Sequence, residues 1–344
     1  MLLVATKLGL TSFGGPIAHL GYFRREYVER RRWIDDHAYA DLVALCQSLP
    51  GPTSSEVGIA VGLLRAGPVG ALFAWLGFTM PSIALMVLFA FVERLPVELG
   101  WLFPVLKLVA FVVVGIAVYR MARALAWDAV RGLLALAAAA IVTIMPGTLT
   151  QIAVMAGAGA VGALALAPPT IEARPPVAVP VSRVVALAAL ALYAGLLVVL
   201  PALRVLTGST EFALFDSFYR ASALVFGGGH VLLPLLEPEV VAPGWVSLDQ
   251  FVVGYGAVQL VPGPINTFAA YLGVLIDGAR GAIIATVAVF LPAFLLVVAS
   301  LPLWGEVRER PLARRALRGV NAAVVGLLLA ALLVIARSIA QTLI

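Results

Sequence analysis

The stretch Gln47-Ser-Leu-Pro-Gly-Pro52 recurs in the second half of the chain as Gln259-Leu-Val-Pro-Gly-Pro264. Proline removes a backbone donor and clashes with the preceding helical turn, so each stretch is expected to break a helix. Trp33 precedes the first stretch by as many residues as Trp245 precedes the second. The matched breaks therefore predict an internal repeat.

Glycines and prolines on both sides extend the repeat. Phe13-Gly-Gly15 recurs as Phe226-Gly-Gly228, and the register continues downstream in the pairs Gly62/Gly273, Gly67/Gly278, Gly70/Gly281, Pro81/Pro292 and Gly115/Gly326. We predict two homologous domains, 1–170 and 180–344. Their repeat cores are 1–125 and 213–340, and linking helices over 129–167 complete the first domain.

Composition places the chain in a membrane. Of its 344 residues, 62% are hydrophobic and 12% are charged, against about 25% charged in a soluble domain. Several stretches carry no charge: 66–92, 132–167, 184–203, 281–305 and 319–336. A helix of about 20 apolar residues crosses a bilayer, and 132–167 suffices for two short helices with a turn at Pro146-Gly147. The sequence predicts an all-α integral membrane protein.

The same composition argues against other classes. The net charge of +5 comes from basic residues between apolar runs, so no nucleic-acid partner is expected. Cys46 is the only cysteine, which excludes a disulfide within the chain and a thiolate metal site. The sequence has no His-Glu-x-x-His run, no paired carboxylates at helical spacing within a span, no nucleophile–base constellation and no P-loop. We therefore expect no enzyme activity, no cofactor and no metal.

Loop charges predict that the two repeats are inserted in opposite orientations. Residues 20–35 contain five arginines, whereas the equivalent 232–247 contains none and carries Glu237 and Glu239. The bias reverses later, because five arginines follow Trp304 (Arg308, Arg310, Arg314, Arg315 and Arg318), whereas the equivalent segment has only Arg94 and Lys107. Basic loops face the cytoplasm, and inverted repeats are typical of secondary transporters with a site near the midplane.

The resulting topology has about seven full spans and about four re-entrant hairpins, with the N-terminus in the cytoplasm and the C-terminus and 232–247 on the outer side. The hairpins would bend at the Gly-Gly and Pro-Gly-Pro breaks. The alternative is that some hairpins are tilted full spans.

The two Pro-Gly-Pro breaks point to a binding site. The helix after each break begins with free N–H groups and a positive dipole end. Polar residues follow, namely Ser54 and Ser55 in the first repeat, and Asn266 and Thr267 in the second. Hydroxyls, an amide and free N–H groups suit an oxyanion, although these residues could also be ordinary helix caps. The predicted site includes the glycines of all the breaks: Gly14, Gly15, Gly51, Gly227, Gly228 and Gly263.

Cations and amides complete the predicted site. Lys7 and Arg220 each lie six residues before a Phe-Gly-Gly. A charge within the membrane is a functional candidate, and two matched cations would balance a dianion. The alternative is that they reach a nearby interface. Gln47 and Gln259 would donate hydrogen bonds to the ligand, or cap carbonyls of the broken helices.

Three residues are candidates for proton coupling. Glu56 follows the first break, and its counterpart is Phe268. Burial of an unpaired carboxylate favours its protonated form, which suits a proton carrier. His19 and His230 follow the Gly-rich bends, where a structural role is the alternative.

Four signatures together resemble those of the chromate ion transporter family. They are Lys7-Leu-Gly-Leu-Thr-Ser-Phe-Gly-Gly-Pro16, Cys46-Gln-Ser-Leu-Pro-Gly-Pro52, Phe226-Gly-Gly-Gly-His230 and Gln259-Leu-Val-Pro-Gly-Pro264. The resemblance covers both repeats. The chain departs from the family in one respect: family members usually carry more residues before the first Phe-Gly-Gly. This leaves the role of Lys7 open.

This resemblance implies a multi-pass protein of the bacterial cytoplasmic (inner) membrane that exports chromate, with sulfate as a competing tetrahedral dianion. We therefore expect a secondary active transporter working by alternating access. Its partners would be chromate or a related oxyanion and the lipid bilayer, and a homodimer is compatible with this reading. The alternatives are a carrier for another small anion such as sulfate, or an anion channel.

Overall fold

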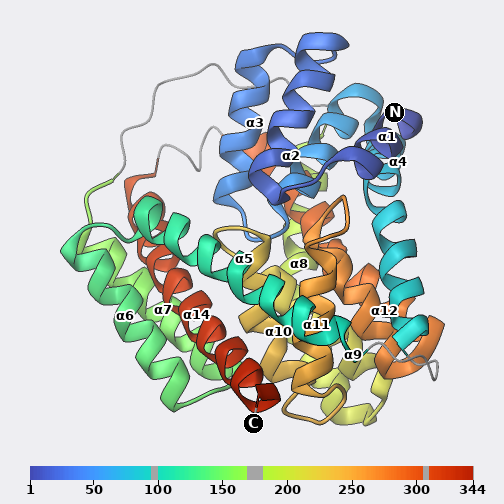
Figure 1. Cartoon of the computed structure of the whole chain (residues 1–344). Helices are drawn as coiled ribbons and strands as arrows, with labels where there is room; N and C mark the ends of the chain where they lie inside the picture. Colours follow the sequence, from blue (N-terminus) through green and yellow to red (C-terminus); the bar gives the residue numbers. More distant parts are fainter. Residues whose placement is uncertain (94–99, 169–180, 305–309, 344) are drawn as a thin grey trace. The chain divides into compact units, whose positions relative to one another are not determined.

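The computed structural model describes residues 1–93, 100–168, 181–304 and 310–343, and all regular secondary structure in these ranges is helical (Figure 1). Arg94 and Arg308, which contribute to the predicted orientation, lie outside the described residues. Six helices in these ranges are long and apolar enough to cross a membrane: α4 (Thr53–Glu93), α5 (Leu102–Leu125), α7 (Thr148–Ala165), α8 (Arg183–Thr207), the run Ile265–Leu303 and Pro311–Ala340. The chain is an all-α integral membrane protein, as its composition predicts.

The charge-free stretch 132–167 forms two helices, as predicted. Helix α6 (Ala129–Ile144) ends just before Pro146-Gly147, and α7 begins directly after that pair. Gly147 has a φ of 147°, which a residue with a side chain rarely adopts. With α6, the six long helices coincide with the seven predicted spans. Which of them cross the membrane, and in which direction, stays a prediction.

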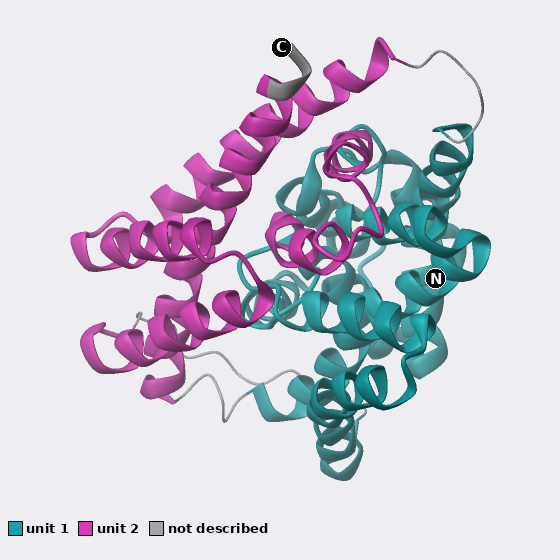
Figure 2. Ribbon diagram, turned by 90° about the horizontal axis from the view of Figure 1, so that it is seen from below, with its two compact units in different colours: residues 1–97, 174–229, 258–304 teal, residues 98–173, 230–257, 305–344 magenta. Residues whose placement is uncertain are grey.

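The chain divides into two compact units (Figure 2). Unit 1 contains residues 1–97, 174–229 and 258–304, and unit 2 contains 98–173, 230–257 and 305–344. Each unit thus takes segments from both predicted repeats. The compact units do not follow the repeat boundaries, which remain a prediction about homology.

Two long helices in unit 1 carry the same turn. Helix α4 turns at Ala66 and Gly67 (φ 64°, ψ −158°), and α12 (Phe268–Ser300) turns at Asp277 and Gly278 (φ 57°, ψ −145°). Glycines pack the two arms of each turn together: a Cβ on Gly62 would lie 2.4 Å from the Gly70 oxygen, and one on Gly273 2.3 Å from the Gly281 oxygen. The glycines that match between the two halves of the sequence therefore occupy the same backbone geometry in α4 and α12.

Helices of unit 1 end and begin at the predicted breaks: α1 (Leu2–Thr11), α3 (Asp36–Ser48) and α9 (Thr210–Ala223) end just before one, and α2 (Gly15–Phe23), α4 and the short η3 (Ile265–Thr267) begin at or just after one. Gly14 and Gly15 have φ values of 96° and 76°, and Gly227 and Gly228 have values of 80° and 119°. Unit 1 also contains the π-helix η1 (Arg24–Arg30) and the short η4 (Leu301–Leu303). The breaks at Gly-Gly and Pro-Gly-Pro are confirmed.

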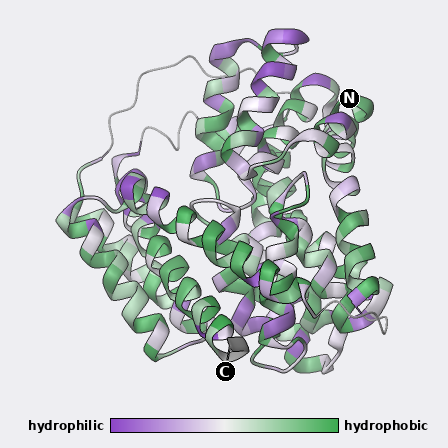
Figure 3. Ribbon diagram, viewed as in Figure 1, coloured by the Kyte–Doolittle hydropathy of each residue, from purple (hydrophilic) through white to green (hydrophobic). Residues whose placement is uncertain are grey.

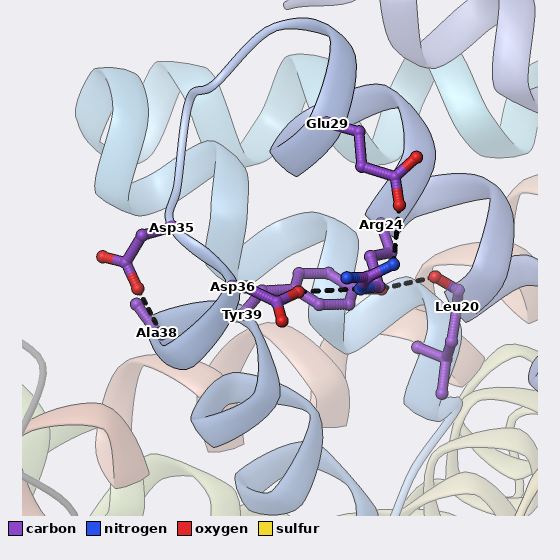
Figure 4. A network of polar contacts seen from close by, with 7 residues as sticks. All are labelled: Leu20, Arg24, Glu29, Asp35, Asp36, Ala38 and Tyr39. Carbon is purple, nitrogen blue, oxygen red and sulfur yellow. Dashed lines mark hydrogen bonds and ion pairs between the residues drawn. The ribbon is translucent and has the colours of Figure 1, made fainter.

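Ion pairs hold the arginine-rich segment between α2 and α3 (Figure 4). Arg24 binds Glu29 at 2.6 Å and Asp36 at 2.7 Å, and the Tyr39 hydroxyl donates to the Leu20 carbonyl at 2.7 Å. The hydrogen bond from Arg24 lowers the pKa of Asp36. Figure 3 shows hydrophilic residues on this segment and hydrophobic ones along α5, α6, α7 and α14.

Unit 2 is built around α14 (Pro311–Leu343), against which α5, α6 and α7 pack. Glycine permits a close helix crossing, because a Cβ on Gly319 would lie 1.9 Å from the Ala158 oxygen of α7. Lys107 on α5 is buried and binds Asp249 at 2.7 Å, and Ser338 donates to the same carboxylate at 3.0 Å. The other helices of the unit are α10 (Leu232–Val240) and α11 (Leu248–Val258), and η2 (Gly229–Val231) lies at its boundary.

Candidate substrate site

The four helix breaks meet inside unit 1 in two crossed pairs. The Gly51 N–H donates to the Val225 carbonyl at 2.7 Å, and the Gly263 N–H donates to the Ser12 carbonyl at 2.9 Å. Val225 and Ser12 each stand immediately before a Phe-Gly-Gly. Each Pro-Gly-Pro break is therefore bonded to the Gly-Gly break of the other repeat.

Only glycine fits at the centre of each Pro-Gly-Pro break. Gly51 and Gly263 have φ values of 147° and 103°. A Cβ on Gly51 would lie 2.3 Å from Glu56 Oε1, and one on Gly263 would lie 2.0 Å from Ser82 Oγ. The Ser82 hydroxyl also donates to the Pro262 carbonyl. Polar side chains thus pack directly against both breaks.

His19 and Ser54 are brought together on the first-repeat side. His19 Nδ1 and Ser54 Oγ lie 3.3 Å apart, and both residues are buried. The edge of the His19 ring packs on Phe78, with ring centroids 5.4 Å apart. His19 therefore has the structural contacts that the sequence left as its alternative role, and it holds Ser54 next to the break.

Several buried donors near these breaks lack a hydrogen-bond partner among the described residues. Such groups are rare in folded proteins, where a buried polar atom almost always finds a partner. Those with hydroxyl or amide N–H groups in unit 1 include Ser12 Oγ, Ser55 Oγ, Thr79 Oγ1, Gln259 Nε2 and Asn266 Nδ2. All of them can donate a proton. Together they suit a ligand that offers only acceptors, as an oxyanion does.

Glu56 is the acidic residue among the buried polar groups near the breaks. Its side chain is fully buried, and neither carboxyl oxygen has a hydrogen-bond partner among the described residues. Its Oε1 lies 2.3 Å from the position of a Cβ on Gly51, so the carboxyl lies against the first Pro-Gly-Pro break. An unpaired carboxyl in an apolar interior is costly when ionised, so this group is suited to hold a proton.

On the second-repeat side, the neighbouring residues Asn266 and Thr267 have different hydrogen-bonding roles. The Thr267 hydroxyl donates to the Pro264 carbonyl at 2.9 Å, which is a local capping role. Asn266 keeps its amide nitrogen without a partner in the described structure. Its Oδ1 lies 3.3 Å from the position of a Cβ on Gly229. Asn266 is thus the better placed of the two to bind a ligand.

Other predicted residues lie in different surroundings. Lys7 on α1 and Gln47 on α3 are exposed. Arg220 binds the buried carboxylate of Asp216, which Arg204 also approaches at 3.4 Å. His230, in unit 2, lies 2.9 Å from the Tyr255 hydroxyl.

Sequence reasoning missed several residues of this region. Ser12 directly precedes Phe13, and Thr79 and Ser82 flank Pro81 in a charge-free span. Polar residues beside a proline in such a span are the signal that could have identified them. Asp216 stands four residues before Arg220, the spacing of an ion pair on one helical face.

The fold and the site define a multi-pass membrane protein with paired broken helices, an arrangement known from secondary transporters. The family model described as chromate transporter matches residues 1–163 and 212–344. The chain belongs to the chromate transporter family. Members of this family are transport proteins and not enzymes, so the chain is a transport protein.

Named relatives agree with this assignment. The probable chromate transport protein of Synechococcus elongatus is 30% identical over 338 residues, covering 96% of this chain and 82% of the relative. The chromate transport protein of Pseudomonas aeruginosa is 31% identical over 326 residues, covering 94% and 77%. That of Cupriavidus metallidurans is 27% identical over 340 residues, covering 96% and 80%. No solved structure matches the chain.

Proposed function

We propose that this protein exports chromate across the cytoplasmic membrane and binds the dianion where the four breaks meet in unit 1. The observation that carries the proposal is the set of buried donors without partners, which includes Ser55 and Asn266. Donors fixed in a low-dielectric interior interact strongly with an anion. The names of the relatives support chromate as that anion.

The two crossed contacts support alternating access as the mechanism. In this proposal the repeats are inverted in the membrane, so the Gly51–Val225 and Gly263–Ser12 contacts are related by symmetry and open in turn. One would admit chromate from the cytoplasm, and the other would release it outside. A dianion leaving a negative interior gains roughly 4.6 kcal/mol per 100 mV, so the membrane potential favours export.

Glu56 is the proposed proton carrier of the cycle. An ionised carboxylate beside the bound dianion would repel it, so the acid is expected to be protonated when chromate is bound. Replacement of Glu56 by glutamine keeps the shape of the side chain and removes the proton.

The test is uptake of radiolabelled chromate by inverted membrane vesicles, with and without an imposed pH gradient. Vesicles carrying the protein should accumulate chromate above the level of empty vesicles, and unlabelled sulfate should compete. Glu56→Gln should remove the effect of the pH gradient, whereas Glu29→Gln, at an exposed acid, should keep it. Equal chromate uptake by vesicles with and without the protein would refute export of chromate. Turnover at channel rates in planar bilayers would refute the carrier mechanism.

A further inference from the structure

Unit 2 contains a cavity of ≈ 230 Å³ that shares no residue with the candidate substrate site. It lies between the α6–α7 turn, α10, α11 and α14, and most of its lining is apolar, including Leu233, Phe251 and Ile335. The polar side chains of the lining are Thr143, Gln151, Glu237 and Arg337. The cavity is therefore amphipathic.

Gln151 presents an acceptor that the surrounding protein does not use. The side chain is 3% exposed, and its Nε2 donates to the Pro234 carbonyl at 2.7 Å. A carbonyl can only accept, so this bond fixes which end of the amide is the nitrogen. Gln151 Oε1 then has no hydrogen-bond partner among the described residues. A ligand with N–H or O–H groups would supply the donor.

Glu237 and Arg337 add one charge of each sign. Both line the cavity, and neither forms an ion pair with the other or with a further residue of the described ranges. Burial raises the pKa of the Glu237 carboxyl, and a cation bound beside it would offset the cost of burying its charge. An acid and a base that line one cavity without pairing suit a ligand carrying both charges.

We propose that this cavity binds the headgroup of a phospholipid with a primary ammonium group. The ammonium donates to Gln151 Oε1 and the Glu237 carboxylate, the phosphate binds Arg337, and the apolar lining accommodates the adjoining chain. A choline headgroup has no N–H donor, and a glycerol headgroup has no cation. The proposed topology places 232–247 and the C-terminal end of α14 on the same side of the membrane, where headgroups lie.

Native mass spectrometry of the full chain in mild detergent tests the proposal. The protein is titrated with phosphatidylethanolamine, phosphatidylcholine and phosphatidylglycerol of identical acyl chains. Phosphatidylethanolamine should bind tightest. Glu237→Gln should weaken its binding by about tenfold or more, because the amide oxygen still accepts but the negative charge that pairs with the ammonium is lost. Glu29→Gln, at an acid of unit 1, is the matched control and should bind as the wild type does.

Two further variants keep the test decisive if Glu237→Gln does not fold. Glu237→Asp retains the acid and should keep the preference for phosphatidylethanolamine over phosphatidylcholine. Arg337→Gln changes an exposed residue and should weaken phosphatidylethanolamine binding. The proposal is wrong if wild-type protein binds phosphatidylcholine as tightly as phosphatidylethanolamine. It is also wrong if Arg337→Gln and a folded Glu237→Gln both bind like the wild type.

Discussion

Single buried donors carry the substrate site. Ser55 and Asn266 come from different repeats, and each is buried without a partner for its donor atom in the described structure. A folded protein retains such groups at a cost. Their persistence at two matched helix breaks is better explained by a ligand than by packing.

Ser55→Ala and Asn266→Ala should each lower chromate uptake by about tenfold or more, because each removes a hydrogen bond to a charged ligand. Uptake by inverted vesicles at subsaturating chromate measures the effect. Thr11→Val is the matched control, since the exposed Thr11 hydroxyl bonds to the Lys7 carbonyl of its own helix. Wild-type uptake in both alanine variants would place the substrate elsewhere, without removing the family assignment.

Residue types and spacing made part of this site predictable. Ser55, Asn266 and Glu56 could be found because each follows a proline break in an apolar segment. The spacing of four residues could also have identified Asp216 as a partner of Arg220, but not the approach of Arg204 to the same carboxylate. Arg204 reaches Asp216 from a different helix, and whether a cation meets a ligand or a carboxylate depends on packing that spacing does not fix.

Paired helix turns set the geometry at the scale of elements. The turns in α4 and α12 share their dihedral angles, and in both of them one glycine faces a backbone oxygen at very short range. The sequence predicted these positions by register alone. The crossed contacts at Gly51 and Gly263 join segments that lie far apart in the chain. Local sequence patterns cannot predict which carbonyl accepts from which N–H over such distances.

Gly62→Ala and Gly273→Ala should both lower thermal stability in detergent, because the new methyl group meets backbone atoms that cannot move aside. Overpacking of this kind costs about 1–3 kcal/mol. Gly115→Ala and Gly195→Ala, where nothing lies within 4 Å of the added Cβ, are the controls. Apparent melting temperatures at one heating rate give the comparison. Equal melting temperatures in test and control variants would mean that the arms of each turn can separate without penalty.

The orientation of the repeats is a property of the whole molecule. It rests on the arginine count of 20–35 against the acidic 232–247. Composition sufficed to predict a helical membrane protein, because apolar length alone decides whether a helix can cross. The division into two compact units could not be predicted, since it depends on which helices of different repeats pack together.

Single cysteines placed at Arg25 and Ala242, in a Cys46→Ala background, should react with a membrane-impermeant thiol reagent from opposite sides. Both positions are exposed, so the reagent can reach them. Arg25→Cys should be labelled in inverted vesicles and Ala242→Cys in intact cells. Labelling of both from one side would refute the opposite orientation of the repeats and, with it, the symmetric gating mechanism.

The bonds from Gly51 to Val225 and from Gly263 to Ser12 bear on how this protein is made. Neither repeat satisfies its own break, so a half-length polypeptide emerging into the bilayer would hold a peptide N–H with no acceptor and no water nearby. Biogenesis must therefore end with a late step in which the C-terminal repeat packs against the N-terminal repeat and the two hydrogen bonds form. A nascent chain arrested before that step would be a substrate for quality-control proteases.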